Sequence, residues 1–121
     1  MKGAASGLTT AGTVLGTPDY MPPEQAQGHP ADFRSDIYSL GVVLFETFTG
    51  KLPFEGDTIM AIVVGHIQKA PPKPRGLNPR LPADLEAVIL RCMEKDPGRR
   101  FQRVDEVLDS LTAISSRVEA A

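Results

Sequence analysis

SDIYSLGVVLFETFTG, residues 35–50, is the stretch that decides the fold. Some of its apolar residues recur at the three- and four-residue steps of a helix: Ile37, Leu40, Leu44 and Phe48. Ser35 can cap the start and Gly50 can end the helix, so we predict a helix over 36–49. Other apolar side chains extend the apolar surface around most of the circumference: Tyr38, Val42, Val43 and Phe45. Such a helix is expected to be buried on several sides.

Three later stretches also repeat apolar residues with a helical period. They predict a helix that begins directly after its cap Asp57 and ends at about Gln68, and further helices over about 83–94 and 104–114. Prolines 71, 72, 74, 79 and 82 predict an extended loop that no helix crosses. Residues 3–19 are rich in Gly and Thr without an apolar period, which predicts a flexible segment with no helix or strand. Because no alternating strand pattern occurs either, the predicted fold class is mainly α.

Composition narrows the possible functions. The 121 residues carry 13 Lys and Arg against 15 Asp and Glu, and this net charge of -2 offers no electrostatic argument for binding nucleic acid. One cysteine, Cys92, and two histidines, His29 and His66, cannot make an intrachain disulfide or a usual zinc site, so we assign them no chemistry and expect no metal. The apolar runs are far shorter than the roughly 18 residues of a membrane helix, and no signal sequence is recognisable. We therefore expect a cytoplasmic protein.

Four motifs follow one another along the chain: GTPDYMPPEQ at 16–25, SDIYSLGV at 35–42, GKLPF at 50–54 and KDPGRRF at 95–101. Together they resemble the C-terminal half of the catalytic domain of bacterial serine/threonine protein kinases. The resemblance covers about residues 6–114, which is well under half of the family's domain. It implies the helical C-terminal subdomain of the protein-kinase-like fold, with the N-lobe and the catalytic loop absent. The implied organisation is a flexible activation-segment remnant at 1–19, a partial kinase domain with helices F to I at 20–114, and a tail at 115–121.

The resemblance also implies an ion pair. The family's Ala-Pro-Glu motif corresponds here to Pro22, Pro23 and Glu24, and its glutamate pairs with a buried arginine that maps onto Arg100. Pro22 replaces a usually small residue and is expected to stiffen the loop. The alternative is a surface Glu and a surface Arg that never meet.

Two residues of the central helix are implied to act as scaffold. The resemblance implies that the carboxylate of Asp36 accepts hydrogen bonds from the backbone of the family's catalytic loop. The alternative is that Asp36 is only a first-turn acid that interacts favourably with the helix dipole. Gly41 lowers the helix propensity, which suggests that another element packs closely against it.

The resemblance implies that the substrate-binding residues precede Glu24 in the sequence. Five residues are implied to receive the substrate: Gly16, Thr17, Pro18, Tyr20 and Met21. The Gly-Thr-Pro-x-Tyr form points to Ser/Thr rather than Tyr substrates. Thr9, Thr10 and Thr13 are candidates for activating phosphorylation, with solvated loop threonines as the alternative.

A basic cluster lies near the last helix: Lys95, Arg99, Arg100 and Arg103. We interpret it as a solvated helix connection rather than a phosphate site, because no aromatic residues are interleaved with it. Arg103 stands where a Ser or Thr cap is common, so the start of the last helix is expected to fray.

Phosphoryl transfer requires a Gly-rich loop, a strand lysine, a catalytic-loop Asp and Asn, and the Asp-Phe-Gly aspartate, and none of these motifs occurs in the 121 residues. The resemblance therefore implies a phosphotransferase whose ATP and Mg²⁺ are bound elsewhere in an intact parent, and we expect this chain to bind no cofactor and to be inactive alone. We interpret it as the tail of a kinase gene cut short upstream.

Two other functions stay open: a stand-alone helical interaction module, and one half of a split kinase. The expected partners are protein substrates and the missing N-lobe or another kinase chain. Without upstream helices, the sides of the central helix that carry Tyr38, Val42, Val43 and Phe45 are expected to lack partners, which favours self-association.

Overall fold

The structure of the chain is a computed structural model, and it describes residues 17–120. The helices follow in the order η1 (Pro18–Tyr20), α1 (Pro23–Ala26), α2 (Phe33–Thr49), α3 (Ile59–Gln68), α4 (Pro74–Leu77), α5 (Ala83–Cys92), η2 (Pro97–Arg99) and α6 (Val104–Ala120), where η marks a short 3-10 helix. No strand occurs between residues 17 and 120. The mainly α fold class is thereby confirmed.

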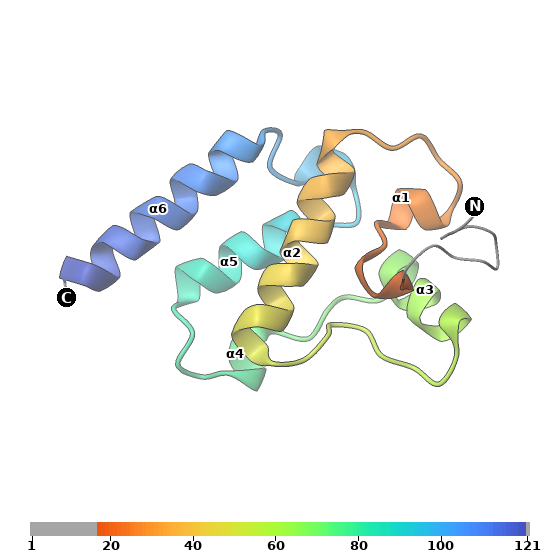
Figure 1. Cartoon of the computed structure of the whole chain (residues 1–121), viewed down its shortest axis with the longest axis horizontal. Helices are drawn as coiled ribbons and strands as arrows, with labels where there is room; N and C mark the ends of the chain where they lie inside the picture. The colour runs from red at the N-terminus through yellow and green to blue at the C-terminus, as the bar shows by residue number, and fades with distance from the viewer. Residues whose placement is uncertain (1–16, 121) are drawn as a thin grey trace.

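Helix α2 runs through the middle of the molecule (Figure 1). Helix α5 packs along α2, and α6 packs against α5. On the other side, η1 lies against both α2 and α3, and α1 contacts α3. The short helix η1 is thus held between α2 and α3, two helices that come later in the sequence.

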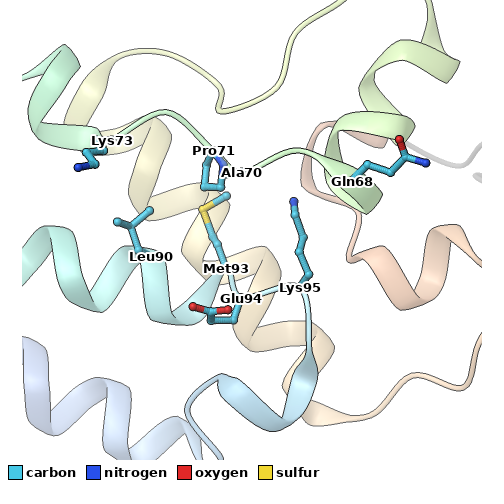
Figure 2. A pocket seen from close by; sticks show the side chains of 8 residues that line it. All are labelled: Gln68, Ala70, Pro71, Lys73, Leu90, Met93, Glu94 and Lys95. Atoms are coloured by element: carbon cyan, nitrogen blue, oxygen red, sulfur yellow. The ribbon is translucent and has the colours of Figure 1, made fainter.

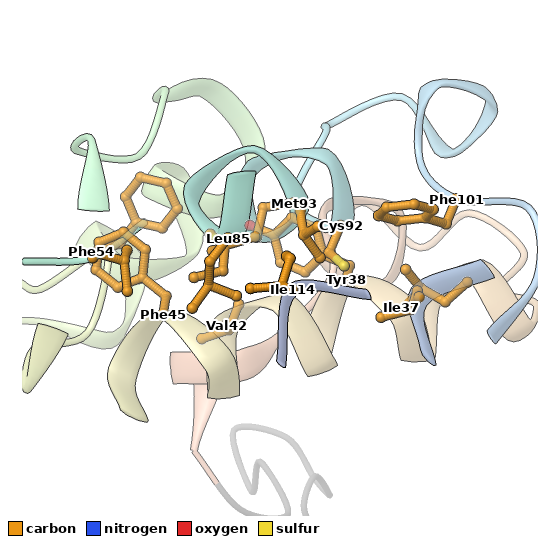
Figure 3. Packing of buried hydrophobic residues seen from close by; sticks show 14 residues of the cluster. Ile37, Tyr38, Val42, Phe45, Phe54, Leu85, Cys92, Met93, Phe101 and Ile114 are labelled. Carbon is orange, nitrogen blue, oxygen red and sulfur yellow. The ribbon is translucent and has the colours of Figure 1, made fainter. Parts of the chain in front are cut away.

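The core forms where α2 meets α5 (Figure 3). Gly41 of α2 makes the approach possible, because a Cβ atom there would lie 2.6 Å from Cβ of Cys92. Three α2 side chains that were expected to lack partners are completely buried: Tyr38, Val42 and Phe45. That expectation is wrong for them because α5 packs along α2, and His66 of α3 and Arg100 contact Tyr38; only Val43 of the four, 46% exposed, matches it.

Two helices begin with a different cap from the one expected. Helix α2 starts at Phe33, and the side chain of Asp32, not Ser35, accepts a hydrogen bond from the backbone N–H of Arg34 at 2.8 Å. In α3, Thr58 rather than Asp57 is the cap. Asp32 and Thr58 have the extended backbone of a cap and directly precede their helices, whereas Ser35 already lies inside α2.

The remaining differences concern proline and helix ends. Pro74 begins α4 inside the stretch expected to be helix-free, and Pro18 begins η1 in the stretch expected to contain no helix. Both occupy the first helical turn, where the missing N–H of proline has no helical partner to lose. Helix α5 ends at Cys92, before the expected Glu94, whereas α6 continues past the expected Ile114 to Ala120.

The start of α6 is held from within the helix. The carboxylate of Glu106 accepts hydrogen bonds from the backbone N–H groups of Gln102, at 2.8 Å, and Arg103, at 3.1 Å. Glu106 thus supplies the glutamate half of a capping box and ties the start of α6 to the residues before it, although Arg103 offers no side-chain cap.

Candidate functional site

Residues 17–21, which we call the docking segment, contain four of the five implied substrate-binding residues. The hydroxyl of Thr17 accepts a hydrogen bond from the backbone N–H of Asp19 at 3.1 Å, which starts η1. Pro18 is buried, and its carbonyl accepts from the N–H of Met21. The fifth residue, Gly16, lies outside the described residues. The phosphorylation candidates also lie outside them: Thr9, Thr10 and Thr13.

Helix α2 holds the docking segment through Tyr20. The Ser39 hydroxyl donates to the backbone carbonyl of Tyr20 at 2.7 Å, and the Tyr20 hydroxyl donates to Oε1 of Glu46 at 2.5 Å. The hydrogen bond to this carboxylate raises the pKa of Tyr20. Two polar side chains of α2 therefore fix the backbone and the side chain of one residue.

Helix α3 holds the same segment through His66, which is fully buried. Its Nε2 lies 2.9 Å from the carbonyl oxygen of Asp19, and its Nδ1 lies 2.7 Å from the hydroxyl of Tyr38. Burial lowers the pKa of His66 to about 4, so the ring is neutral near pH 7. The rings of Phe54 and His66 pack edge to face, with their centroids 5.0 Å apart.

Glu24 and Arg100 form a two-fold hydrogen-bonded ion pair directly after the docking segment. Nη1 and Nη2 of Arg100 lie 2.7 and 2.8 Å from Oε2 and Oε1 of Glu24. The side chain of Arg100 is 0% exposed and that of Glu24 is 9% exposed. Burial by itself raises the pKa of Glu24, but hydrogen bonds from Arg100 and Ser35 outweigh it and lower the pKa to about 2. The carboxylate is therefore charged at every pH of biological interest.

The same guanidinium also joins other elements. Arg100 donates to the backbone carbonyls of Arg34, at 2.9 Å, and Glu94, at 2.7 Å, and lies 5.0 Å from the centre of the Tyr38 ring. The donors of the Arg100 guanidinium thus find acceptors in α1, in α2 and in the residues that follow α5.

The basic cluster does not form one solvated patch, which corrects the expectation for Arg100 and Lys95. Arg100 is buried, and Lys95 is half-buried with its Nζ 4.4 Å from the centre of the Phe54 ring. Burial and the nearby Arg100 lower the pKa of Lys95 to about 8. Arg99 and Arg103 are exposed as expected.

A cavity of about 480 Å³ opens beside Lys95, between the chain that follows α3 and the end of α5 (Figure 2). Its lining includes Gln68, Pro71, Leu90 and Met93 but no residue of the docking segment. Within the described part of the chain, no group of three or more His, Cys, Asp or Glu side chains could hold a metal. None of the helices between residues 17 and 120 combines the length and apolar character of a membrane-spanning helix.

The two residues expected to act as scaffold differ in their surroundings. Gly41 lies at the closest approach of α2 and α5. Asp36 is exposed in the first turn of α2.

Three residues that hold the docking segment were not found by sequence reasoning: Ser39, Glu46 and His66. The available signal was a polar residue inside an apolar helical run, as in the neighbours Val64, Gly65, His66 and Ile67.

Comparison with known proteins identifies the family of the chain. A family model described as the protein kinase domain matches residues 3–111. The chain is 47% identical over 111 residues to a probable serine/threonine-protein kinase of Clostridium acetobutylicum, covering 92% of this chain and 17% of that protein. It is 40% identical over 110 residues to the serine/threonine-protein kinase PksC of Streptomyces coelicolor, covering 91% of this chain and 20% of that protein. The chain thus spans at most a fifth of the length of these relatives.

A solved structure shares the fold. The twitchin kinase region from C. elegans superposes with a TM-score of 0.72 at 20% sequence identity, over 79% of this chain and 17% of that one. The matched family model, the bacterial relatives and the shared fold lead to one conclusion: the chain belongs to the protein kinase family, as a segment similar to the C-terminal part of bacterial serine/threonine kinase domains.

Proposed function

We propose that this chain is the substrate-docking part of a serine/threonine protein kinase, which in an intact kinase phosphorylates Ser or Thr of proteins in the cytoplasm. The observation that carries the proposal is the buried pair of Glu24 and Arg100, which at 2.7 Å ties α1, directly after the docking segment, to the chain between α5 and α6. Phosphoryl transfer depends almost entirely on positioning, so a docking segment held at a fixed place is a functional part of the enzyme.

We further propose that the chain alone transfers no phosphate. The groups that position ATP, Mg²⁺ and the attacking hydroxyl in protein kinases belong to motifs that these 121 residues do not contain. ATP and Mg²⁺ would be bound by the nucleotide-handling part of an intact kinase.

A direct test measures nucleotide binding and phosphate transfer by the purified chain. We expect titration calorimetry with Mg²⁺ and ATP to give no binding heat, and a basic Ser/Thr-containing protein to gain no phosphate. The Streptomyces coelicolor relative serves as the positive control. Turnover of ATP by this chain alone would contradict the proposal.

A chimera tests the docking role. Residues 3–111 replace the matching segment of the Clostridium acetobutylicum relative, and the product is assayed with a Ser/Thr peptide and with the Tyr version of the same peptide. We expect phosphorylation of the Ser/Thr peptide only. Arg100→Ala should abolish most of this activity, whereas Arg103→Ala, which breaks only an exposed pair with Asp105, should retain it. A folded chimera without activity would contradict the proposed role.

The exposed apolar side chains of Val43 and Phe48 on α2, 46% and 38% exposed, favour a second candidate. In that candidate the chain is a helical interaction module, or the half of a split kinase, and the surface around Val43 binds another kinase chain. The test mixes the chain with a separately expressed kinase N-lobe and measures complex formation by analytical ultracentrifugation, together with phosphate incorporation. A complex that Val43→Lys disrupts would favour this candidate, and the absence of any complex would end it.

A further inference from the structure

We infer that His66 is a positioning residue for substrate docking: through its Nε2 it holds the carbonyl of Asp19 and thereby fixes the docking segment against α2 and α3. This inference rests on the proposed function, since it concerns how the same segment receives a substrate. It assigns a role to a buried histidine that touches no reacting atom.

The hydrogen-bond partners determine the state of the ring. A carbonyl can only accept a hydrogen bond, so the Nε2 atom that lies 2.9 Å from the Asp19 oxygen must carry the proton. In a neutral ring the other nitrogen, Nδ1, is then an acceptor, and it receives the hydroxyl proton of Tyr38 at 2.7 Å. Both ring nitrogens are therefore used, and neither the tautomer nor the ring orientation is free to change without losing a bond.

The surroundings keep the ring neutral. Tyr38 approaches from α2, the Phe54 ring from the segment before α3, and Asp19 from η1. Lys95, which follows α5, donates through Nζ to the backbone carbonyl of Gly65, next to His66 in the sequence. Burial and the positive charge of Lys95 both disfavour a second proton on the ring. Nδ1 consequently stays available as an acceptor near pH 7.

His66 also connects the docking segment to the ion pair. The guanidinium of Arg100 lies 5.0 Å from the centre of the Tyr38 ring, and the Tyr38 hydroxyl donates to His66. A continuous set of contacts therefore runs from Arg100 through Tyr38 and His66 to the Asp19 carbonyl. Because Ser39 holds the next carbonyl, that of Tyr20, at 2.7 Å, two successive peptide groups of the docking segment are fixed from two different helices.

The first test uses the 121-residue chain and two substitutions that separate donor from acceptor. His66→Gln keeps an N–H donor near the position of Nε2, whereas His66→Phe keeps a ring and removes both hydrogen bonds. Nitrogen NMR of the wild type should show the Nε2–H tautomer. Exchange of the Met21 amide, which donates to Pro18 inside η1, should accelerate roughly three- to tenfold in His66→Phe and return toward the wild-type rate in His66→Gln.

Val63→Ala, on the same helix but without a hydrogen bond to the docking segment, is the matched control and should leave the Met21 exchange rate unchanged. The Nδ1–H tautomer, or equal Met21 exchange rates in wild type and His66→Phe, would overturn the inference. If His66→Phe does not fold, the tautomer of the wild-type ring decides the matter: the Nε2–H form supports the inference and the Nδ1–H form overturns it.

The second test uses the chimeric kinase and separates this inference from the proposed function. His66→Phe should raise KM for the peptide roughly three- to tenfold without changing kcat or KM for ATP, and His66→Gln should restore the peptide KM. An active chimera whose peptide KM is unaffected by His66→Phe would overturn the positioning role alone. An inactive wild-type chimera would instead count against the proposed function, and His66 would then be judged on the tautomer and exchange results.

Discussion

Glu24 and Arg100 are both charged and both buried, which makes them the residues whose loss the molecule tolerates least. Their pairing is bidentate, and Ser35 donates a further hydrogen bond to Glu24 Oε2 at 2.5 Å. Replacing both partners could be nearly neutral, but removing one leaves the other charge without compensation in the interior. The stabilising effect of each residue thus depends on the presence of the other.

We predict that Glu24→Ala lowers the free energy of unfolding by about 3–5 kcal/mol because Arg100 then remains buried and unpaired. Urea denaturation followed by circular dichroism measures this change. Arg103→Ala removes an exposed ion pair with Asp105 and should cost less than about 1 kcal/mol. Equal losses in the two variants would show that the buried pair contributes no more than a surface pair.

At the scale of elements, the contact between α2 and α5 depends on a missing side chain. A Cβ atom on Gly41 would lie 2.6 Å from Cβ of Cys92 and 2.8 Å from Cγ of Met93, both closer than real Cβ contacts allow. Gly41 costs the helix about 1 kcal/mol of propensity relative to Ala, and this loss is offset by the close packing of the two helices. Packing therefore outweighs propensity at this position.

Gly41→Ala is predicted to lower the free energy of unfolding by about 1–3 kcal/mol, because α5 must move to admit the methyl group. Gly76→Ala is the matched control, since a Cβ atom there meets nothing within 4 Å and should be neutral or slightly stabilising. Thermal unfolding of both variants measures the difference. A Gly41→Ala variant as stable as Gly76→Ala would mean that the approach of α2 and α5 is looser than described.

At the scale of the whole molecule, two buried titratable groups make stability depend on pH in the same direction. His66 has a folded-state pKa of about 4, below its ordinary 6.5, and Glu24 has one of about 2, below its ordinary 4.5. In both cases the unfolded chain takes up a proton at a higher pH than the folded chain does. The stability that these two groups contribute is therefore fully present above about pH 6.5 and is lost as the pH falls, first through the window of His66 and then through that of Glu24.

We predict a loss on the order of 3 kcal/mol from His66 between pH 6.5 and 4, since one pKa unit corresponds to about 1.36 kcal/mol. Urea denaturation at a series of pH values measures the slope. His66→Gln cannot titrate and should flatten the curve between pH 6.5 and 4 while leaving the steeper fall below pH 4.5. An unchanged slope in that variant would assign the upper window to another group.

The exposed apolar surface predicts self-association of the chain. Phe48 and Val118 line one side of a cavity of about 310 Å³ whose lining is almost entirely apolar, and both are exposed. Sedimentation velocity should show a concentration-dependent increase in mass that Phe48→Lys reduces. Leu77→Lys, at a similarly exposed apolar residue of α4, is the control and should leave the association unchanged.

Much of the fold could be predicted because the relevant signals are local. The apolar periods of α2, α3 and α5 lie within single stretches of sequence, and the expected helices agree with the structure to within a few residues. The caps were misassigned because Ser35 and Asp57 are as suitable in residue type as Asp32 and Thr58, and only the structure shows which residue directly precedes each helix. The hydroxyl of Ser35 instead donates a hydrogen bond to Glu24, a contact that the helical period of the sequence does not reveal.

The candidate site could be predicted from the sequence only in part. Glu24 and Arg100 could be paired beforehand because a family motif relates them, although they lie 76 positions apart. No motif related His66 to Asp19, 47 positions earlier, or Glu46 to Tyr20. Helix periods and a family motif thus determined the mainly α fold and its buried ion pair. The hydrogen bonds that hold the docking segment depended on the folded arrangement, because distance between side chains in space, rather than separation along the chain, decides which donor meets which acceptor.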